Sequence, residues 1–349
     1  MPAISVIVPM RNEAKGISAC LCSLLTQTLP PSEYEIIVVD GMSEDGSAAI
    51  ASKLQAETPN LTVLSNAARI MPAGMNIGLR HAGSPVVVVA GAHTTYPSNY
   101  LDTCLKYLDK TGADVVGGPL LTRANGSGWM SGVIAAILSS RFGVGSVAFR
   151  TGLKEGWVDT VPYGAYRKAI FDACGMYEED LVRAQDAELH ARIRQSGGRI
   201  YQTPELLTYY QPVSGFQNLC RKAFLDGFWQ CVAAIKNPNC LSPRRFAPAA
   251  MVLLLTGLAS LAVFFPATWV LIAAVMIMYL TAGYCFGSAQ SRTHGFLTRF
   301  FLPFFAFPFH VCYGVGTVAG LSHVPRKPAR PKPTRTAGPL HPRSSAKLQ

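Results

Sequence analysis

Two short polar segments each follow an apolar, β-branched run near the N-terminus. Residues 9–13 (PMRNE) follow Ile4–Val8, and residues 40–47 (DGMSEDGS) follow Glu35–Val39. A carboxylate such as Asp40 accepts a hydrogen bond from a nucleobase N–H, and the small residues beside it leave room for a ligand. The same residue types also form ordinary turns and helix caps. A nucleotide pocket and a pair of structural loops therefore remain as alternatives.

Two later positions also carry side chains suited to chemistry. His93 follows the apolar run Val86–Ala90, and an imidazole is a suitable ligand for Mn²⁺, although a buried structural histidine is the alternative. The segment Gln185–Gln195 has helical spacing and carries Asp186 and Glu188 near its start. A carboxylate in the first turn is favoured by the helix macrodipole, so a purely structural role is open for Asp186 as well.

The elements that must position these residues alternate along the first 117 residues. Strands are expected at Ile4–Val8, Glu35–Val39, Leu61–Leu64, Val86–Ala90 and Asp114–Gly117, and helices at 13–25, 47–54, 73–81 and 100–109. This alternation predicts an α/β fold, a mostly parallel sheet with helices on both faces. Ligands bind such sheets beyond the carboxyl ends of the strands, where Asn12, Asp40 and His93 fall.

The charge is distributed very unevenly. The chain has 349 residues, a formal charge of +11 and a hydrophobic content of 49%. All 20 acidic residues lie at or before Asp226 with 19 basic ones, and residues 227–349 contain 12 basic and no acidic residues. The basic residues flank apolar runs, which favours an anionic membrane surface as the partner and argues against nucleic acid.

Three apolar runs predict a membrane region. Ala249–Phe265 and Thr268–Phe286 have 17 and 19 uncharged residues, and Phe300–Leu321 has 22 but is interrupted by Pro303 and Pro308. Each is long enough to cross about 30 Å of hydrocarbon. Within the third run, Gly316-x-x-x-Gly320 predicts close packing of another helix. We therefore expect an α/β domain at 1–235, a membrane region at 236–321 with two to three apolar segments, and a basic, Pro-rich, disordered tail at 322–349.

The topology of this region stays open. A cytoplasmic catalytic domain and a basic cytoplasmic tail need an even number of crossings, yet there are three runs. Either the proline-interrupted third run is re-entrant or the tail lies outside. Residues 1–10 indicate a strand and not a signal peptide, and the nine cysteines lack a C-x-x-C pair. We therefore expect reduced thiols and a multi-pass protein of the inner (plasma) membrane with a cytoplasmic catalytic domain.

Ordered blocks over residues 3–235 resemble one family. The blocks are P-x-x-N-E at 9–13, V-V-D-G-x-S-x-D-G at 38–46, R-x-x-P-A-G-M-N-I-G-x-x-x-A at 69–82, G-V-G at 143–145, F-R at 149–150, D-T-V at 159–161 and Q-D-A-E-L-x-x-R at 185–192. In combination they resemble the inverting family 2 glycosyltransferases of GT-A fold, in the ExoA-type branch of succinoglycan biosynthesis. His310-x-x-Tyr313-Gly-x-Gly316 is similar to that branch too.

The resemblance implies roles for particular residues. It implies that Asp186 is the general base that deprotonates the acceptor hydroxyl, a role worth about 10²–10⁴ in rate. It also implies that Glu188 and Arg192 either contact the acceptor or orient the helix that carries the base. Arg192 could pair with either carboxylate. The residues implied in donor binding are Pro9, Arg11, Asn12, Glu13, Asp40, Ser43, Asp45, Arg69 and Asn76.

The resemblance also implies a divalent cation, Mn²⁺ or Mg²⁺, held by a D-x-D after the fourth strand. Here the segment reads Gly91-Ala92-His93, so the first carboxylate is missing. His93 is the remaining metal candidate, and a metal shared with the donor diphosphate is still compatible with this set.

The expected function is a membrane-anchored transferase that moves a sugar from a nucleotide donor, a UDP-sugar by expectation, to a lipid-linked saccharide in exopolysaccharide or glycolipid synthesis. Two alternatives remain. One is transfer to polyprenyl phosphate itself, which acceptance of a phosphate would reveal. The other, motivated by Gly91, is a non-catalytic nucleotide-sugar-binding assembly partner, which would bind donor without turnover.

Overall fold

The strands form an eight-stranded and a two-stranded sheet within residues 1–124, 126, 128–145, 147–210, 212, 215–240 and 243–323, the part of the chain that the computed structural model describes. The larger sheet has the order β3-β2-β1-β4-β8-β5-β9-β7, and β10 pairs with β6. The strands are β1 (Ile4–Met10), β2 (Tyr34–Asp40), β3 (Leu61–Ser65), β4 (Val86–Val89), β5 (Val115–Gly117), β6 (Leu120–Thr122), β7 (Gly156–Trp157), β8 (Ala165–Arg167), β9 (Ile200–Gln202) and β10 (Thr208–Tyr210).

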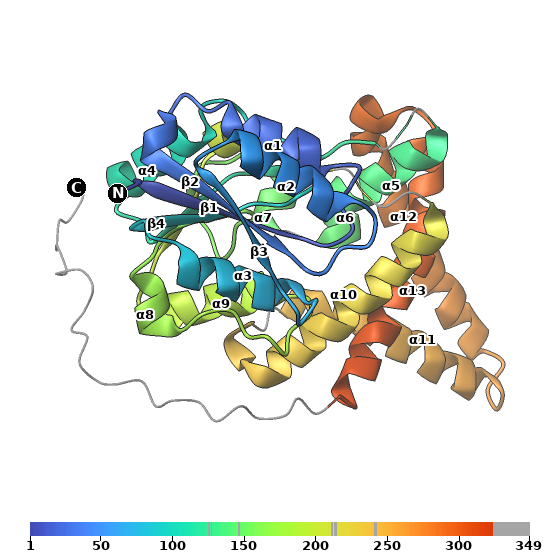
Figure 1. Ribbon diagram of the computed structural model, residues 1–349. Coiled ribbons are helices and arrows are strands. Elements are labelled where there is room, and N and C mark those ends of the chain that lie inside the picture. The colour runs from blue at the N-terminus through green and yellow to red at the C-terminus, as the bar shows by residue number, and fades with distance from the viewer. Residues whose placement is uncertain are drawn as a thin grey trace, which may run out of the picture.

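Helices cover both faces of the larger sheet, as expected from the sequence (Figure 1). One core joins the sheet to α1 (Ile17–Leu25), α2 (Ser47–Glu57) and α4 (Tyr100–Thr111). The core on the other face includes α3 (Met71–His81), α8 (Ile170–Cys174) and α9 (Gln185–Gln195). The first helix begins at Ile17 and not at Glu13, because residues 13–16 form a turn in which the Glu13 carbonyl accepts from the backbone N–H of Gly16 and of Ile17.

The strands that end at the polar segments are neighbours. β1 is parallel to β2 and to β4, with Met10 opposite Asp40 and Ile7 opposite Val89. Their carboxyl ends therefore lie side by side. In Figure 1 these ends point toward the side of the molecule that carries α10 (Phe216–Lys236) and α12 (Thr268–His294).

Two strands depart from the parallel pattern. β8 is antiparallel to both β4 and β5, and β7 is antiparallel to β9. Because β8 runs the other way, the residues just before it, Tyr163 and Gly164, reach the same edge as the residues just after β4. The three-residue length of β8 gives too short an alternation for sequence pattern to reveal.

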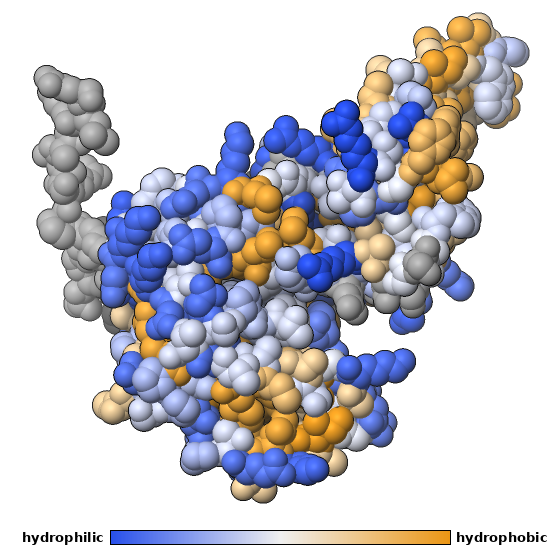
Figure 2. Space-filling model, turned by 90° about the horizontal axis from the view of Figure 1, so that it is seen from above, coloured by the Kyte–Doolittle hydropathy of each residue, from blue (hydrophilic) through white to orange (hydrophobic). Residues whose placement is uncertain are grey.

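Three long apolar helices follow α10: α11 (Ala247–Ala262), α12 and α13 (Thr298–Leu321). The helical segments Pro243–Ala262, which adds a short 3₁₀ turn to α11, Thr268–His294 and Thr298–Leu321 are each long and apolar enough to cross a membrane. The α11–α12 end of the molecule carries exposed apolar side chains, and Figure 2 shows a projecting, mostly apolar arm. These side chains include Leu253, Leu254, Val263, Phe264, Phe265, Trp269, Val270, Leu271, Ile277 and Met278.

The third apolar helix packs against the α/β part of the protein. A Cβ added to Gly316 would lie 2.1 Å from the Phe224 carbonyl oxygen, and one added to Gly320 would lie 2.7 Å from that of Phe228. A Cβ on Gly227 of α10 would lie 2.1 Å from the Tyr313 carbonyl. The predicted close contact at Gly316 and Gly320 is therefore confirmed, and the partner is α10.

Both internal prolines lie inside α13, which continues through them. Pro303 contacts α12 where that helix carries Gly283, whose added Cβ would lie 2.5 Å from the Pro303 Cβ. His310 is buried and bonds to Tyr279 Oη at 2.8 Å and to the Gly143 carbonyl at 3.1 Å. Packing on three sides holds the helix together where the sequence alone suggested a break.

All nine cysteines are free, in agreement with the expectation of reduced thiols. Burial raises the pKa of Cys20 to about 12, so this thiol stays protonated. Cys22 and Cys285 are exposed, whereas the other seven are buried or half-buried. The basic tail at 324–349 lies outside the described residues.

Candidate functional site

Hydrogen bonds join the loops that follow β1 and β2. The Asn12 backbone N–H donates to Ser43 Oγ at 2.9 Å, and the Glu44 backbone N–H donates to Asn12 Oδ1 at 2.9 Å. Asn12 has φ 56°, in a left-handed region that asparagine adopts more readily than most residues. Asn12 and Ser43, both expected to bind donor, therefore hold these two loops together.

Asp45 and Ser47 make a second set of contacts between the loops. Asp45 Oδ2 accepts from the Ala14 backbone N–H at 3.0 Å, and Ser47 Oγ accepts from the Glu13 backbone N–H at 2.7 Å. Hydrogen bonds from the Ser47 hydroxyl and from the backbone of Ala14 and Ser47 lower the pKa of Asp45. The carboxylate is thus already engaged, so Asp45 shapes the pocket by fixing its loops.

Asp40 lies at the end of β2 with its side chain buried. Its two carboxylate oxygens lie 3.3 and 3.1 Å from the Ser43 backbone nitrogen, the one donor that reaches them among the described residues. An ionised carboxylate has about four acceptor positions. Asp40 therefore keeps acceptor capacity for a ligand N–H.

Two exposed arginines lie beside this pocket. Arg11 Nη1 donates to the Arg69 carbonyl oxygen at 3.3 Å, and Arg69 Nη1 lies 3.8 Å from Glu44 Oε1. Arg69 has φ 59°, a conformation that costs about 1 kcal/mol or more for a residue with a Cβ. Their positive charges face solvent, where an anionic ligand would have access to them.

His93 pairs with Glu13 across the ends of β4 and β1. His93 Nδ1 lies 3.3 Å from Glu13 Oε1, and both side chains are partly exposed. A cluster of three or more metal-ligating side chains does not occur within the described ranges. Mg²⁺ and Mn²⁺ are commonly held by one or two protein groups together with substrate phosphates, and imidazole with carboxylate suits Mn²⁺. The Glu13–His93 pair therefore fits a cation that shares its coordination with a diphosphate.

The position of the missing carboxylate is filled by a tyrosine. A Cβ added to Gly91 would lie 2.6 Å from Tyr163 Cε1 and 2.8 Å from Tyr163 Cζ. Tyr163 itself has φ 47°, a left-handed conformation that is unusual for an aromatic residue. An aspartate at position 91 would collide with this ring, so Gly91 and Tyr163 are sterically dependent on each other.

Arg150 is a functional candidate that the residue-type analysis missed. Its Nη1 is buried and has no hydrogen-bond partner among the described residues. The guanidinium carbon lies 5.3 Å from the centre of the Tyr210 ring, which is 6.4 Å from the His93 ring. Arg150 and Tyr163 also interact electrostatically. The F-R block at 149–150 was the one signal in the sequence, and it names no chemistry by itself.

Asp186 lies in the first turn of α9, after Ala184 at φ 60°. Its carboxylate has no hydrogen bond or ion pair to another described residue, and burial raises its pKa to about 6. The charge of Asp186 acts on Tyr163, so the start of α9 faces the same space as Gly91. One turn later, burial lowers the pKa of His190 to about 3, so that imidazole stays neutral and leaves Asp186 uncompensated.

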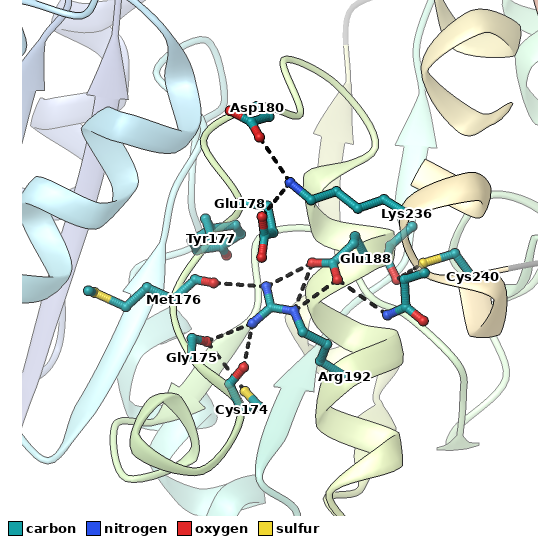
Figure 3. Close-up of polar contacts among 12 residues, drawn as sticks. Cys174, Gly175, Met176, Tyr177, Glu178, Asp180, Glu188, Arg192, Lys236 and Cys240 are labelled. Carbon is teal, nitrogen blue, oxygen red and sulfur yellow. Dashed lines mark hydrogen bonds and ion pairs between the residues drawn. The ribbon is translucent and has the colours of Figure 1, made fainter. Parts of the chain in front are cut away.

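Glu188 and Arg192 position α9. Glu188 is buried and accepts two hydrogen bonds from Arg192 Nε at 2.9 and 2.8 Å, together with one from Asn237 Nδ2 at 3.2 Å. Arg192 also donates to the carbonyls of Gly175 and Met176 (Figure 3). Of the two carboxylates available to it, Arg192 pairs with Glu188. Both side chains are therefore fully engaged in orienting α9, and Asp186 is left free.

Pro9 and Asn76, both expected to bind donor, are buried within the protein. Pro9 is buried within β1, opposite Val39. Asn76 is buried in α3, where Nδ2 donates to the Tyr177 carbonyl and to Glu179 Oε1, both at 2.9 Å, and Oδ1 accepts from the Tyr177 backbone N–H. The amide thus fixes the loop that precedes α9, a supporting role for the site in place of the expected donor contact.

Comparison of the sequence with known proteins finds several that are similar. Residues 5–175 match the family model for glycosyl transferase family 2. The chain is 31% identical over 227 residues to the succinoglycan biosynthesis protein ExoA of Rhizobium meliloti, an alignment that covers 64% of this chain and 66% of that protein. It is 26% identical over 236 residues to a dolichyl N-acetyl-α-D-glucosaminyl phosphate glycosyltransferase of Methanococcus voltae, covering 65% and 72% of the two chains.

Solved structures show the same fold. The mannosyltransferase PcManGT of Pyrobaculum calidifontis, solved with GDP-Man and Mn²⁺, superposes with a TM-score of 0.58 at 19% identity, covering 92% of this chain and 87% of that one. The TarS 1–349 structure from S. aureus with UDP-GlcNAc gives a TM-score of 0.51 at 18% identity, with 91% of each chain covered. The fold is thus the GT-A type that the sequence predicted, followed by three apolar helices.

Proposed function

This protein is a family 2 glycosyltransferase similar to ExoA, and we propose that it transfers a sugar, with inversion at the anomeric carbon, from a nucleotide-sugar donor to a lipid-linked saccharide at a membrane. The observation that carries the proposal is the state of Asp186. It is the carboxylate at this edge of the sheet that has a raised pKa and no partner among the described residues.

Asp186 acts as the general base. In an inverting displacement the acceptor hydroxyl attacks the anomeric carbon while a positioned group removes its proton. A carboxylate with a pKa of about 6 is a better proton acceptor than an ordinary aspartate and is still mostly ionised at pH 7. The Glu188–Arg192 pair supports this role by fixing the helix that carries it.

The donor occupies the edge formed by β1, β2 and β4. Asp40 accepts from a nucleobase N–H, and Arg11 and Arg69 contact diphosphate oxygens. Glu13 and His93 hold a divalent cation that, when bound, neutralises charge on the diphosphate. Arg150 lies within electrostatic range of Tyr163, as Asp186 does, and its buried Nη1 has no partner among the described residues. Its positive charge would stabilise the negative charge that develops on the leaving group. UDP is the nucleotide we propose, because TarS was solved with UDP-GlcNAc.

The three apolar helices hold the catalytic site close to a membrane, where a lipid-linked acceptor is located. We propose that α11 and α12 cross the inner (plasma) membrane and that α13 lies at its surface. About 39% of the most apolar stretch of α13 is buried inside the protein, against 11% for each of the other two. Its partner helix α10 carries Lys222 and Asp226 in an ion pair, charges that are costly in hydrocarbon. Two crossings put the catalytic domain and the basic tail on the cytoplasmic side together.

This arrangement divides the chain into three parts: a catalytic part at 1–235, a membrane part at 236–321 and the tail at 322–349. The ExoA relative supports a role in exopolysaccharide or glycolipid synthesis, and the Methanococcus relative supports a lipid-linked acceptor, since its name gives a dolichyl phosphate saccharide as substrate.

The test is a screen of nucleotide sugars with membranes that contain the full-length protein, in which released nucleoside diphosphate is measured with and without Mn²⁺. We expect release that depends on added lipid-linked saccharide and is lost in Asp186→Asn. Donor binding without release across the whole panel of acceptors would instead identify a non-catalytic binder. Release supported by polyprenyl phosphate alone would identify transfer to the carrier itself.

A further inference from the structure

A cavity of about 380 Å³ lies away from the donor edge, between α9, the loop after β7 and the turn that leads into α11. Three arginines line it: Arg194 of α9, and Arg244 and Arg245 of the turn. Asp159 is the one acidic side chain in the lining. None of the residues assigned above to the donor or to the metal lines this cavity.

The positive charge of the cavity is poorly compensated. Arg194 Nη1 lies 3.5 Å from Asp159 Oδ1, but the Asp159 side chain is 72% exposed, so this pair is weak. Within the described ranges, Arg244 and Arg245 form no ion pair with a carboxylate. Arg245 Nη1 donates to the neutral Gln230 Oε1 at 2.6 Å. Three guanidinium groups against one carboxylate leave a surplus of two positive charges.

The three arginines line the same cavity and lie within electrostatic range of common neighbours. Cys240, which also lines the cavity, interacts electrostatically with both Arg194 and Arg245. Arg245 is in turn within electrostatic range of Arg244 and Asp159. Guanidinium groups present planar donor pairs that match phosphate oxygens, so a set of this kind is suited to a phosphate or a diphosphate.

The cavity connects the active-site helix with the first apolar helix. Ala187, the residue after Asp186, lines it, and Arg194 follows two turns later on the same side of α9. Arg244 and Arg245 immediately precede α11, whose Leu253 and Leu254 side chains are exposed. An anion in the cavity would therefore lie against α9, the helix that carries Asp186, while a hydrocarbon chain attached to it extends along α11.

We propose that this cavity binds the phosphate or diphosphate of the lipid carrier that bears the acceptor saccharide. The inference rests on the proposed function and adds the group by which the acceptor is recognised. A soluble sugar phosphate would leave the adjoining apolar helix uncontacted, and a lipid without a phosphate would leave the arginines without an anion. A phosphorylated lipid would contact both. Donor diphosphate binds at the β1 and β4 edge, so the two anions of the reaction bind at separate places.

Farnesyl diphosphate, a short prenyl diphosphate, is the probe for the test. Its binding to the detergent-purified full-length protein is measured for wild type, Arg244→Gln and Arg245→Gln. Arg292→Gln is the matched control, because Arg292 is an exposed arginine at the end of α12, close to the membrane but outside the cavity. Loss of one hydrogen bond to a charged group predicts a Kd at least about tenfold weaker in each cavity variant. The control should stay within about twofold of wild type.

Competition identifies the source of the phosphate. Inorganic diphosphate should displace the probe, since the arginines bind its charge, whereas phosphatidylglycerol at the same concentration should displace it far less. Equal displacement by phosphatidylglycerol would show a general headgroup site and overturn the proposal, as would an unchanged Kd in both cavity variants. Nucleotide binding measured on the same preparations confirms that the variants are folded.

Failure of this proposal is distinguishable from failure of the proposed function. If wild type transfers sugar to lipid-linked saccharide while Arg244→Gln keeps the same KM for that acceptor, the cavity assignment is wrong and the enzyme assignment stands. If wild type binds the probe through these arginines but never transfers sugar, the cavity assignment stands and the catalytic one is wrong.

Discussion

Replacing Asp186 by asparagine should make the protein more stable and almost inactive. The side chain keeps its size but can no longer accept a proton or carry a charge. Burial raises the pKa of this carboxyl to about 6 from its usual 3.8. At 1.36 kcal/mol per pH unit, ionising Asp186 in the folded protein costs about 3 kcal/mol more than ionising it in the unfolded chain.

The sign of the effect follows from the raised pKa. Below pH 3.8 the carboxyl is protonated in both states, so no cost arises. Between about pH 3.8 and pH 6 the unfolded chain releases this proton while the folded protein retains it, so the stability of wild type falls relative to the variant. Above about pH 6 both states are ionised and the difference is complete. Between pH 4 and pH 8 the stability of Asp186→Asn should therefore rise against wild type by about 2–3 kcal/mol, roughly 4–12 °C in Tm for a domain of this size.

The activity of the same pair of proteins should change in the opposite direction. Turnover of wild type should rise with pH around a midpoint near 6, as Asp186 ionises, and Asp186→Asn should be slower by about 10² or more at every pH. Donor affinity should hardly change. The assays use the full-length protein in detergent. Thermal unfolding is measured across pH 4–8, and nucleotide release is measured across pH 5–8.

Glu188→Gln is the control, two residues further along the same helix. Glu188 is buried in a bidentate pair with Arg192, so its loss leaves a buried arginine without its partner and should destabilise by about 3–5 kcal/mol. Its loss of turnover should be the smaller of the two. Equal Tm differences at pH 4 and pH 8 for Asp186→Asn, together with wild-type turnover, would refute the assignment of Asp186 as a general base with a raised pKa.

Three further results are expected. Asp40→Ala should weaken nucleotide binding about tenfold or more, since one hydrogen bond to a charged acceptor is lost; unchanged affinity in isothermal titration of folded protein would place the base pocket elsewhere. Gly91→Asp alone should lower the free energy of unfolding by about 1–3 kcal/mol, and with it Tm, because its Cβ meets the Tyr163 ring. Adding Tyr163→Gly should recover part of that loss and strengthen Mn²⁺ binding in spin-resonance titrations. Equal Tm values for Gly91→Asp and wild type would contradict this steric account. Full-length protein should resist carbonate extraction from membranes, and release by carbonate would remove the membrane assignment. A green fluorescent protein fused after Gln349 should fluoresce in cells, whereas a dark fusion, together with an active alkaline phosphatase when that enzyme is fused at the same position, would place the tail outside.

The sequence was sufficient for the elements that repeat regularly. Continuous apolar strands and helices of eight or more residues follow from periodicity, which is why α9 was expected at Gln185–Gln195 and is found there. The resemblance to family 2 rests on the same regular part of the chain. The family match at 5–175 and the similarity to ExoA confirm it.

The sequence could not show which side chains of the site are engaged in hydrogen bonds with distant parts of the chain and which are left available. Asn76 was expected to bind donor, but a contact across about a hundred residues engages its amide with the Tyr177 loop. Arg150 was passed over because nothing local marks an arginine that folding leaves without a partner. The choice of Arg192 between two carboxylates likewise depends on carbonyls supplied by the loop before α9, which no spacing rule includes.

The three apolar runs illustrate the same limit. Composition identified the apolar runs, but the close approach of Gly316 and Gly320 to α10 decides that α13 is shielded from lipid over part of its length. A proline-interrupted run is ambiguous in sequence, because whether the helix continues depends on the neighbours that pack around each proline.

The central claim is tested most directly by following a radiolabelled sugar from the nucleotide donor identified in the screen. Full-length protein is incubated with that donor and lipid-linked saccharide, and the products are separated between an organic and an aqueous phase. The account predicts label in the organic phase, attached to the saccharide with the opposite anomeric configuration to the donor, and none with Asp186→Asn. Label that stays entirely on nucleotide, or appears only as free sugar in water, would contradict it.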